Sequence, residues 1–312
     1  MDFSIFYKES FDNGDYSKLD HYDIFLSAFD NCDRTRIVFE NVNADIKYWF
    51  LFPQNTYVQD GVPTDNVYKS GFFKEDEYFL DFIRMGVISN KLSICIDITG
   101  FLRPHLLFLL KYIRILGVQR LDMIYTEPAQ YRDGDETKFS GFIDEIRSVE
   151  GYTSANINPN SDNDLLIVGA GYDDYLIAKI AQHKSKTKNK YFILGFPSLQ
   201  PDMYQENILK MGRANESIGE GKHIRYAPAF DPFITAETIK DIVNENPNVT
   251  NIYLSPLSTK PHTIGMALYF LWYSDNQPLN IIFPYSNHYA TKHAIGVKRT
   301  WKYTIELPKK SI

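Results

Sequence analysis

The chain has 312 residues, of which 44% are hydrophobic and 15% aromatic, and its formal net charge is -6. This composition is typical of a globular protein and excludes an intrinsically disordered one, and the length suits two hydrophobic cores better than one. The negative charge argues against extended binding of duplex nucleic acid, which relies on a broad basic face.

No run of residues reaches the roughly 18 to 20 apolar positions of a membrane span, so no membrane partner is expected. The first residues, Met1 to Ser4, lack the basic and apolar regions of a signal peptide. Two cysteines, Cys32 and Cys95, are too few for a disulfide framework. Together these features predict a cytoplasmic protein.

Short apolar runs alternate with helix-length segments along the whole chain. The predicted strands are residues 24–29, 47–52, 92–98, 121–125, 165–168, 191–194, 252–254 and 280–283. Continuous apolar strands separated by helices are typical of a mainly parallel sheet that is covered on both faces. The predicted fold class is therefore α/β, with a Rossmann-like half at each end of the chain.

Residues 138–157 interrupt this alternation and are predicted to form a hairpin or a short helix between the halves. The turn-forming residues 158–163 that follow are the predicted linker. This places the N-terminal half at residues 1–160 and the C-terminal half at residues 161–312. Near the C-terminus, residues 299–307 alternate between polar and apolar side chains, which predicts an antiparallel edge strand.

The two halves carry similar elements in the same order. Arg103-Pro104-His105 follows one predicted strand and precedes an apolar helix, and Lys260-Pro261-His262 does the same in the other half. Upstream, Asp30 and Asp173 each follow the first strand of their half. This recurrence predicts two halves related by an internal pseudo-two-fold duplication.

Both Pro-His elements lie where a parallel strand ends and a helix begins, and ligands of open parallel sheets bind at that edge. Proline suits the first turn of a helix, and the free backbone N–H groups there attract anions. Arg103 and Lys260 each add a cation directly before the proline. We therefore expect a phosphate-binding site in each half. The strand ends supply further expected contacts, namely Thr99, Gly100, Ser258 and Thr259.

The two histidines of these elements allow two interpretations. Imidazole titrates near neutral pH, so His105 and His262 are candidate acid and base residues as well as candidate ligand contacts. Alternatively, both histidines bind local backbone, and the preceding cations are solvated residues at a helix start.

The stretch from Asp97 to Pro104, Asp-Ile-Thr-Gly-Phe-Leu-Arg-Pro, resembles the strand-four signature of CARF domains, the Rossmann-like sensors of cyclic oligonucleotides in prokaryotic defence. Residues 257–261, Leu-Ser-Thr-Lys-Pro, resemble a second form of that signature. CARF sites are made by pairing two such domains, and the similar SAVED domains fuse two in one chain. The resemblance implies that the two halves bind a phosphorylated nucleotide. No effector domain is recognisable in the chain, so the effector would be a separate protein.

The other ligand-contacting loop of that family follows the first strand. Asp30 holds this position in the first half, and Gly171, Tyr172 and Asp173 hold it in the second. The resemblance adds these four residues to the expected ligand contacts.

Two more side chains are candidates on the same edge: Glu127 for lining the cleft and Tyr204 for stacking on a base. No metal site is expected, because the seven histidines show no metal-ligand spacing with cysteine. No nicotinamide or flavin cofactor is expected either, because Asp174 occupies the third glycine position of the fingerprint that would begin at Gly169.

The function expected from these features is that of a sensor for a cyclic oligonucleotide-like second messenger in a prokaryotic anti-phage defence or signalling system. Two alternatives stay open at this point. One is a phosphodiesterase or ring-nuclease-like enzyme that cleaves such a nucleotide, with His105 and His262 as acid and base. The other is an interaction scaffold without a ligand.

Overall fold

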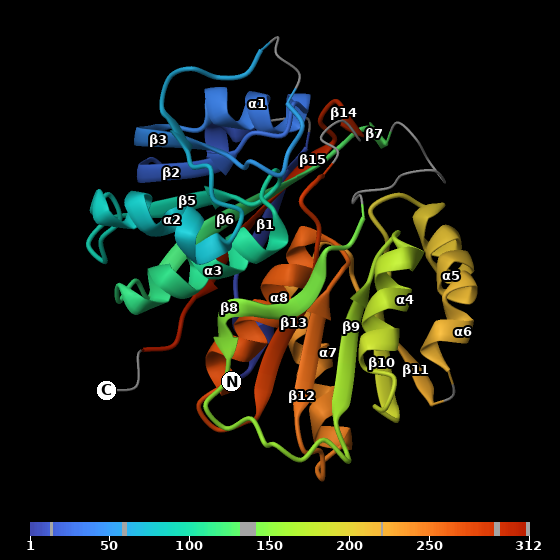
Figure 1. Cartoon of the computed structure of the whole chain (residues 1–312). Helices are drawn as coiled ribbons and strands as arrows, with labels where there is room; N and C mark the ends of the chain where they lie inside the picture. The colour runs from blue at the N-terminus through green and yellow to red at the C-terminus, as the bar shows by residue number, and fades with distance from the viewer. Residues whose placement is uncertain (13–14, 58–60, 132–141, 220, 290–293, 310–312) are drawn as a thin grey trace. The chain divides into compact units, whose positions relative to one another are not determined.

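The computed structural model describes residues 1–12, 15–57, 61–131, 142–219, 221–289 and 294–309. These residues form two units, each built around its own sheet (Figure 1). We name each unit after its first parallel strand. The β2 unit comprises Phe6–Phe142 and Ser286–Ile312, and the β9 unit comprises Met1–Ile5 and Ile143–Tyr285.

In the β2 unit the strands pair in the order β1-β15-β6-β5-β2-β3-β4. Strands β2 to β6 run parallel, whereas β15 is antiparallel to both of its neighbours. The strand bounds are β1 Lys8–Asp12, β2 Tyr22–Ala28, β3 Ala44–Leu51, β4 Val67–Lys69, β5 Ile94–Asp97, β6 Arg120–Glu127 and β15 Arg299–Glu306. The helices between the parallel strands are α1 Asp33–Asn41, α2 Glu75–Arg84 and α3 Arg103–Ile115, and a separate ribbon pairs β7 Gln130–Tyr131 with β14 Ala294–Ile295.

In the β9 unit the order is β11-β10-β9-β12-β13-β8, and β8 alone among these described strands runs antiparallel. The strand bounds are β8 Glu145–Thr153, β9 Leu165–Ala170, β10 Asn189–Gly195, β11 Lys222–Ala227, β12 Ile252–Pro256 and β13 Leu279–Tyr285. The helices are α4 Asp174–His183, α5 Met203–Arg213, α6 Asn215–Ile218, α7 Pro232–Glu245 and α8 Lys260–Tyr273.

Burial accounts for these elements. Every residue of β5 and of β9 is buried, as expected for central strands with helices on both faces. Helix α2 instead buries one stripe, which includes Tyr78, Phe79 and Phe82. Acidic side chains fill the first turn of α2, where they complement the positive end of the helix dipole.

The parallel strands follow one order in both units. Counted along the chain within each unit, the order is three-two-one-four-five, which is that of a Rossmann sheet. The predicted α/β fold with two Rossmann-like halves is therefore confirmed. The point at which the strand order reverses lies between β2 and β5 in one unit and between β9 and β12 in the other. We call each of these a switch point.

The unit boundaries differ from the predicted halves of residues 1–160 and 161–312. Strand β8 pairs with β13, so it belongs to the β9 unit, and the chain passes between units near residues 5, 142 and 285. The predicted linker 158–163 is a turn inside the β9 unit, where the Asn251 amide donates to the carbonyl oxygens of Asn158 and Asn160. Turn-forming residues mark a turn equally well between two domains and between two strands. Of the predicted bridge, residues 138–141 lie outside the described residues.

The C-terminal strand β15 is antiparallel as predicted, but it is not an edge strand. It lies between β1 and β6 and is buried from Thr300 to Ile305. Its alternation arises because polar side chains that are themselves buried have hydrogen-bond or ion-pair partners. Thr304 donates to Asp122 at 2.8 Å, and Lys302 forms ion pairs with Asp122 and Asp20 at 3.4 and 2.8 Å. Alternating polarity therefore marks a satisfied polar face here, not a solvated one.

Candidate functional site

At the switch point of the β2 unit, the backbone of the loop after β5 contacts the end of β2. Gly100, in the loop from β5 to α3, lies against the end of β2. A Cβ atom at residue 100 would lie 2.0 Å from the carbonyl oxygen of Ala28. Any side chain there would displace backbone, so glycine is required for the two strand ends to meet.

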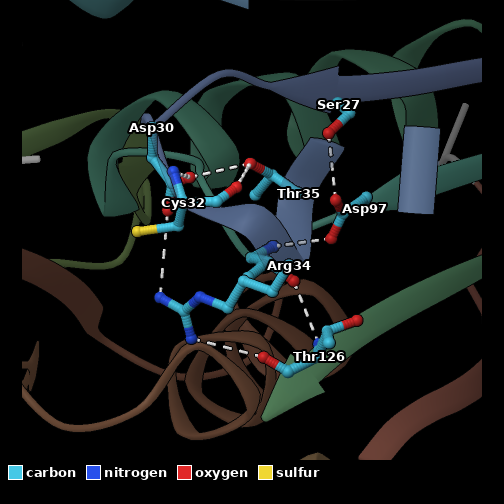
Figure 2. Close-up of polar contacts among 8 residues, drawn as sticks. Ser27, Asp30, Cys32, Arg34, Thr35, Asp97 and Thr126 are labelled. Carbon is cyan, nitrogen blue, oxygen red and sulfur yellow. Dashed lines mark hydrogen bonds and ion pairs between the residues drawn. The ribbon is translucent and has the colours of Figure 1, made fainter. Parts of the chain in front are cut away.

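Asp97, the last residue of β5, is a fully buried carboxylate (Figure 2). Its Oδ2 accepts a hydrogen bond from the Ser27 hydroxyl on β2 at 2.9 Å, and its Oδ1 accepts one from the Thr99 N–H at 3.0 Å. Burial raises the pKa of Asp97 to about 6, although both hydrogen bonds favour the ionised form. Asp97 thus ties the loop after β5 to the neighbouring strand.

Asp30, a predicted ligand contact, orders the start of α1. Its Oδ1 accepts hydrogen bonds from the Cys32 N–H at 3.1 Å and from the Thr35 hydroxyl at 2.7 Å, and its Oδ2 lies 3.8 Å from Nη2 of Arg34. Nη1 of Arg34 donates to the carbonyl oxygen of Thr126 on β6 at 3.3 Å. Because β5 lies between β2 and β6, the Arg34 guanidinium crosses the switch point from one side to the other (Figure 2).

Thr99 and Glu127 face the interior of the β2 unit. The Thr99 hydroxyl accepts a hydrogen bond from the Thr126 N–H at 3.0 Å. Oε1 of Glu127 accepts one from the Trp301 indole N–H on β15 at 2.6 Å, and burial raises the pKa of Glu127. Both predicted contacts are buried, and in this structure their side chains hold strand ends together.

His105 is also buried. Its ring centroid lies 4.6 Å from that of Phe52 and 5.3 Å from that of Tyr78, within an aromatic cluster between α2 and α3. A ring in this position contributes to packing of the core. The burial gives no support to a ligand contact or to an acid–base role for His105.

Arg103 is the part of the first Pro-His element that reaches the surface. It begins α3 and is half-buried, and Pro104 follows within the first turn. The N-cap residue, Leu102, makes no side-chain hydrogen bond to the helix. The positive end of the α3 dipole and the cationic residue Arg103 therefore both lie at the switch point.

A similar contact between two loops occurs at the switch point of the β9 unit, but here the glycine is in the loop after β9. A Cβ atom at Gly171 would lie 2.3 Å from the carbonyl oxygen of Leu257. Gly171 follows the first parallel strand of its unit, whereas Gly100 follows the fourth parallel strand of the other unit. The close approach of the two loops recurs in both units even though a different loop supplies the glycine.

Asp173 and Thr259 cap the helices that begin at this switch point. Oδ1 of Asp173 accepts a hydrogen bond from the Leu176 N–H at 3.2 Å. The Thr259 hydroxyl accepts one from the His262 N–H at 3.3 Å and donates to the carbonyl oxygen of Ala229 at 2.6 Å. The capping role is typical of these residue types, and their contact with a ligand stays a prediction.

His262 is buried and binds backbone. Its Nε2 lies 3.1 Å from the carbonyl oxygen of Pro228, to which the neutral ring donates. Burial lowers the pKa of His262 to about 4. The ring therefore joins α8 to the loop after β11, which fits the backbone-binding interpretation and gives no support to acid–base catalysis.

The remaining predicted contacts of the β9 unit are less deeply buried, except Ser258. Lys260 begins α8 and is half-buried, as Arg103 is in the other unit. Tyr172 is also half-buried, and Nζ of Lys210 lies 5.7 Å from its ring centroid. Helix α5, which carries Lys210, covers the end of β9, because the Asn207 amide on the same helix donates to the carbonyl oxygen of Ala170 at 3.3 Å.

Tyr204 belongs to a partly exposed aromatic group at the ends of β10 and β11. Its ring centroid lies 4.8 Å from that of Phe196, and its hydroxyl donates to the Tyr226 hydroxyl at 3.4 Å. The contact of Tyr204 with a ligand stays a prediction.

Two positively charged residues near the switch points were not predicted from the sequence. Arg34 is one turn beyond Asp30, but its approach to Thr126 depends on a strand 92 residues away in the chain. Lys210 lies on α5, between β10 and β11, whereas the described residues between β3 and β4 of the β2 unit include no corresponding helix. The ion pair of Arg34 with Asp30 could have been predicted, since oppositely charged side chains four residues apart lie on the same helix face.

The chain matches no protein-family model and no curated protein. Within the part of the chain that the structure describes, no group of three or more His, Cys, Asp or Glu side chains is placed to hold a metal ion. The described helices include none that is long and apolar enough to span a bilayer.

Proposed function

We propose that the protein is a sensor of a cyclic oligonucleotide-like second messenger, which acts through a separate effector in a prokaryotic anti-phage defence or signalling system. One recurrence carries the proposal. In both units a half-buried cation followed by proline starts the helix that leaves the fourth strand of a Rossmann sheet, at the switch point. Ligands of this class of sheet bind at that point.

Phosphate suits these two places for electrostatic reasons. The first turns of α3 and α8 present backbone N–H groups at the positive end of a helix dipole, beside Arg103 or Lys260. Arg34 adds a second guanidinium in the β2 unit, and Lys210 adds an ammonium group near Tyr172 in the β9 unit. Each switch point thus carries two cationic side chains in a chain whose net charge is -6, and Arg34 is paired with the carboxylate of Asp30.

The proposal also assigns a compartment and a mode of action. Cys32 and Cys95 are buried and are not joined in a disulfide, which suits the reducing cytoplasm. To signal, the nucleotide must bind one conformation more tightly than another, since equal affinity shifts no equilibrium.

The proposal is tested by incubating the protein with a panel of cyclic and linear oligonucleotides. Both the melting temperature and the chemical integrity of each nucleotide are measured. We expect one or more cyclic members to raise the melting temperature and to be recovered intact. Turnover of the nucleotide would favour the phosphodiesterase alternative over a sensor, and no response to any member would contradict both.

Arg103→Ala and Lys260→Ala are each expected to weaken binding of the responding nucleotide by at least about tenfold, or about 1.4 kcal/mol, because each removes a cation from a phosphate contact. The dissociation constant is measured by calorimetry. Lys186→Ala is the matched control, since Lys186 is exposed in the loop between α4 and β10. A loss in only one of the two variants would show that the Pro-His element of the other unit is structural.

A further inference from the structure

A cavity of about 260 Å³ lies in the β2 unit between α1, β3 and the loop after β3. Three aromatic rings form its walls. The Phe39 and Trp49 rings are stacked, with centroids 4.0 Å apart and an interplanar angle of 15°, and Phe29 meets Trp49 edge-on at 5.6 Å. Rings that pack on one another in this way make a preformed apolar wall.

Two opposite charges line the same cavity. Arg36 and Glu40 are one helical turn apart on α1, and both are exposed. Cζ of Arg36 lies 5.9 Å from the Phe29 ring centroid, and its Nη2 donates a long hydrogen bond of 3.5 Å to the carbonyl oxygen of Gly61. Among the described residues, neither Arg36 nor Glu40 forms an ion pair within 4.0 Å. The Glu40 carboxylate and the other N–H groups of Arg36 are therefore accessible to solvent or to a ligand.

Gly61 brings the loop close enough to complete the cavity. Its φ of +89° is strained for other residues, and a Cβ atom there would lie 3.0 Å from Nη2 of Arg36. The loop carbonyl can therefore approach the guanidinium without a side chain filling the space.

The charges and aromatic rings that line the cavity favour one class of ligand. A cation would be repelled by Arg36, and a phosphate by Glu40 and by the negative faces of the rings. A flat, neutral heterocycle avoids both penalties and stacks on the aromatic wall. The volume is below the about 300 to 1,000 Å³ of pockets for drug-sized ligands, so it suits a single base and not a whole dinucleotide.

Hydrogen bonding distinguishes among the bases. Guanine presents two adjacent N–H donors, which a carboxylate accepts together, and the acceptors O6 and N7, which suit a guanidinium. Adenine places an acceptor beside its amino group, so the second oxygen of a carboxylate would be repelled there. We propose that this cavity binds the guanine base of a nucleoside or nucleotide, with Glu40 and Arg36 reading its edges.

The inference does not rest on the proposed phosphate sites, since neither Arg103 nor Lys260 lines the cavity. The test uses guanosine, which has no phosphate. We expect guanosine to quench the fluorescence of Trp49 and to release or absorb heat in a calorimeter, and adenosine and cytidine to bind at least about tenfold more weakly. Trp49→Phe identifies the fluorescence signal of the cavity, because the chain has only two other tryptophans.

Matched variants locate the site. Glu40→Gln is expected to weaken guanosine binding at least about tenfold, since it replaces one acceptor by a donor that faces the guanine N–H groups. Glu77→Gln, at an exposed position on α2, is expected to bind guanosine as the parent does. Absence of guanosine binding, stronger binding of adenosine, or equal affinity in Glu40→Gln would overturn the proposal.

Discussion

Gly100→Ala is expected to lower the free energy of unfolding of the β2 unit by about 3 kcal/mol or more. The added Cβ atom would lie 2.0 Å from the carbonyl oxygen of Ala28 and 3.3 Å from the Thr35 side chain. Backbone cannot yield as a flexible side chain does, so the end of β2 and the loop after β5 must separate. Overpacking in a core costs about 1 to 3 kcal/mol where side chains can move, and more where backbone must.

Gly171→Ala is expected to affect the β9 unit in the same way, since its Cβ atom would lie 2.3 Å from the carbonyl oxygen of Leu257. Tryptophan fluorescence can follow the two units separately during unfolding by urea. Trp49 and Trp301 belong to the β2 unit and Trp272 to the β9 unit, so Trp272→Phe leaves a signal from the β2 unit alone. The double variant Trp49→Phe with Trp301→Phe leaves the β9 unit.

Each unit offers its own control. A Cβ atom at Gly71 in the β2 unit or at Gly212 in the β9 unit would meet no atom within 4 Å. Gly212→Ala is expected to be neutral or to stabilise α5 by up to about 1 kcal/mol, because alanine favours a helix. If Gly100→Ala unfolded at the same urea concentration as Gly71→Ala, the close approach of the two strand ends would not be a requirement of the fold.

The positions of the parallel strands could be predicted because a strand buried on both faces must be apolar along its length. Both central strands, β5 and β9, follow this rule. The unit boundaries could not be predicted in the same way. Whether β8 and β15 complete one sheet or the other depends on pairing between segments far apart in the chain, as for β15 with β6. The local pattern of polar and apolar residues does not specify that pairing.

The candidate site was predictable in place and less so in detail. The motif residues Gly100 and Arg103 lie at a switch point because chain order and strand order together place them there. The burial of His105 and His262 was not predictable, since it depends on what covers each helix start: an aromatic cluster beside His105 and the loop after β11 beside His262. The cavity beside Trp49 depends in addition on a loop that approaches Arg36 through a glycine.

Asp97→Asn is expected to remove a pH dependence of stability from the β2 unit. The pKa of Asp97 rises from an ordinary 3.8 to about 6 in the folded chain, so the folded state holds this proton more tightly than the unfolded state does. The stabilising contribution is therefore complete below about pH 3.8 and is lost as the pH rises through about 6. The difference of about two pKa units corresponds to about 3 kcal/mol.

Asparagine preserves the contacts of Asp97 without its charge. The amide oxygen can still accept the Thr99 N–H, and the amide nitrogen can donate to the Ser27 hydroxyl, which accepts as well as donates. At pH 7 the variant should therefore be at least as stable as the parent, and the difference in free energy of unfolding should shrink as the pH falls from 6 to 4. The measurement is urea unfolding across that range in the Trp272→Phe background.

The unfolding of the β2 unit must be followed separately, because His262 in the β9 unit changes the free energy of unfolding with pH in the opposite direction. Its pKa is lowered from 6.5 to about 4, so the stability it contributes is present above pH 6.5 and is lost as the pH falls through about 4. Asp81→Asn is the control for Asp97→Asn, since the Asp81 side chain is 71% exposed on α2. It should reproduce the parent profile in the β2 unit. A profile for Asp97→Asn as steep as that of the parent would show that Asp97 is not the buried group that binds the proton, and that the carboxylate at the switch point stays ionised at no cost to the fold.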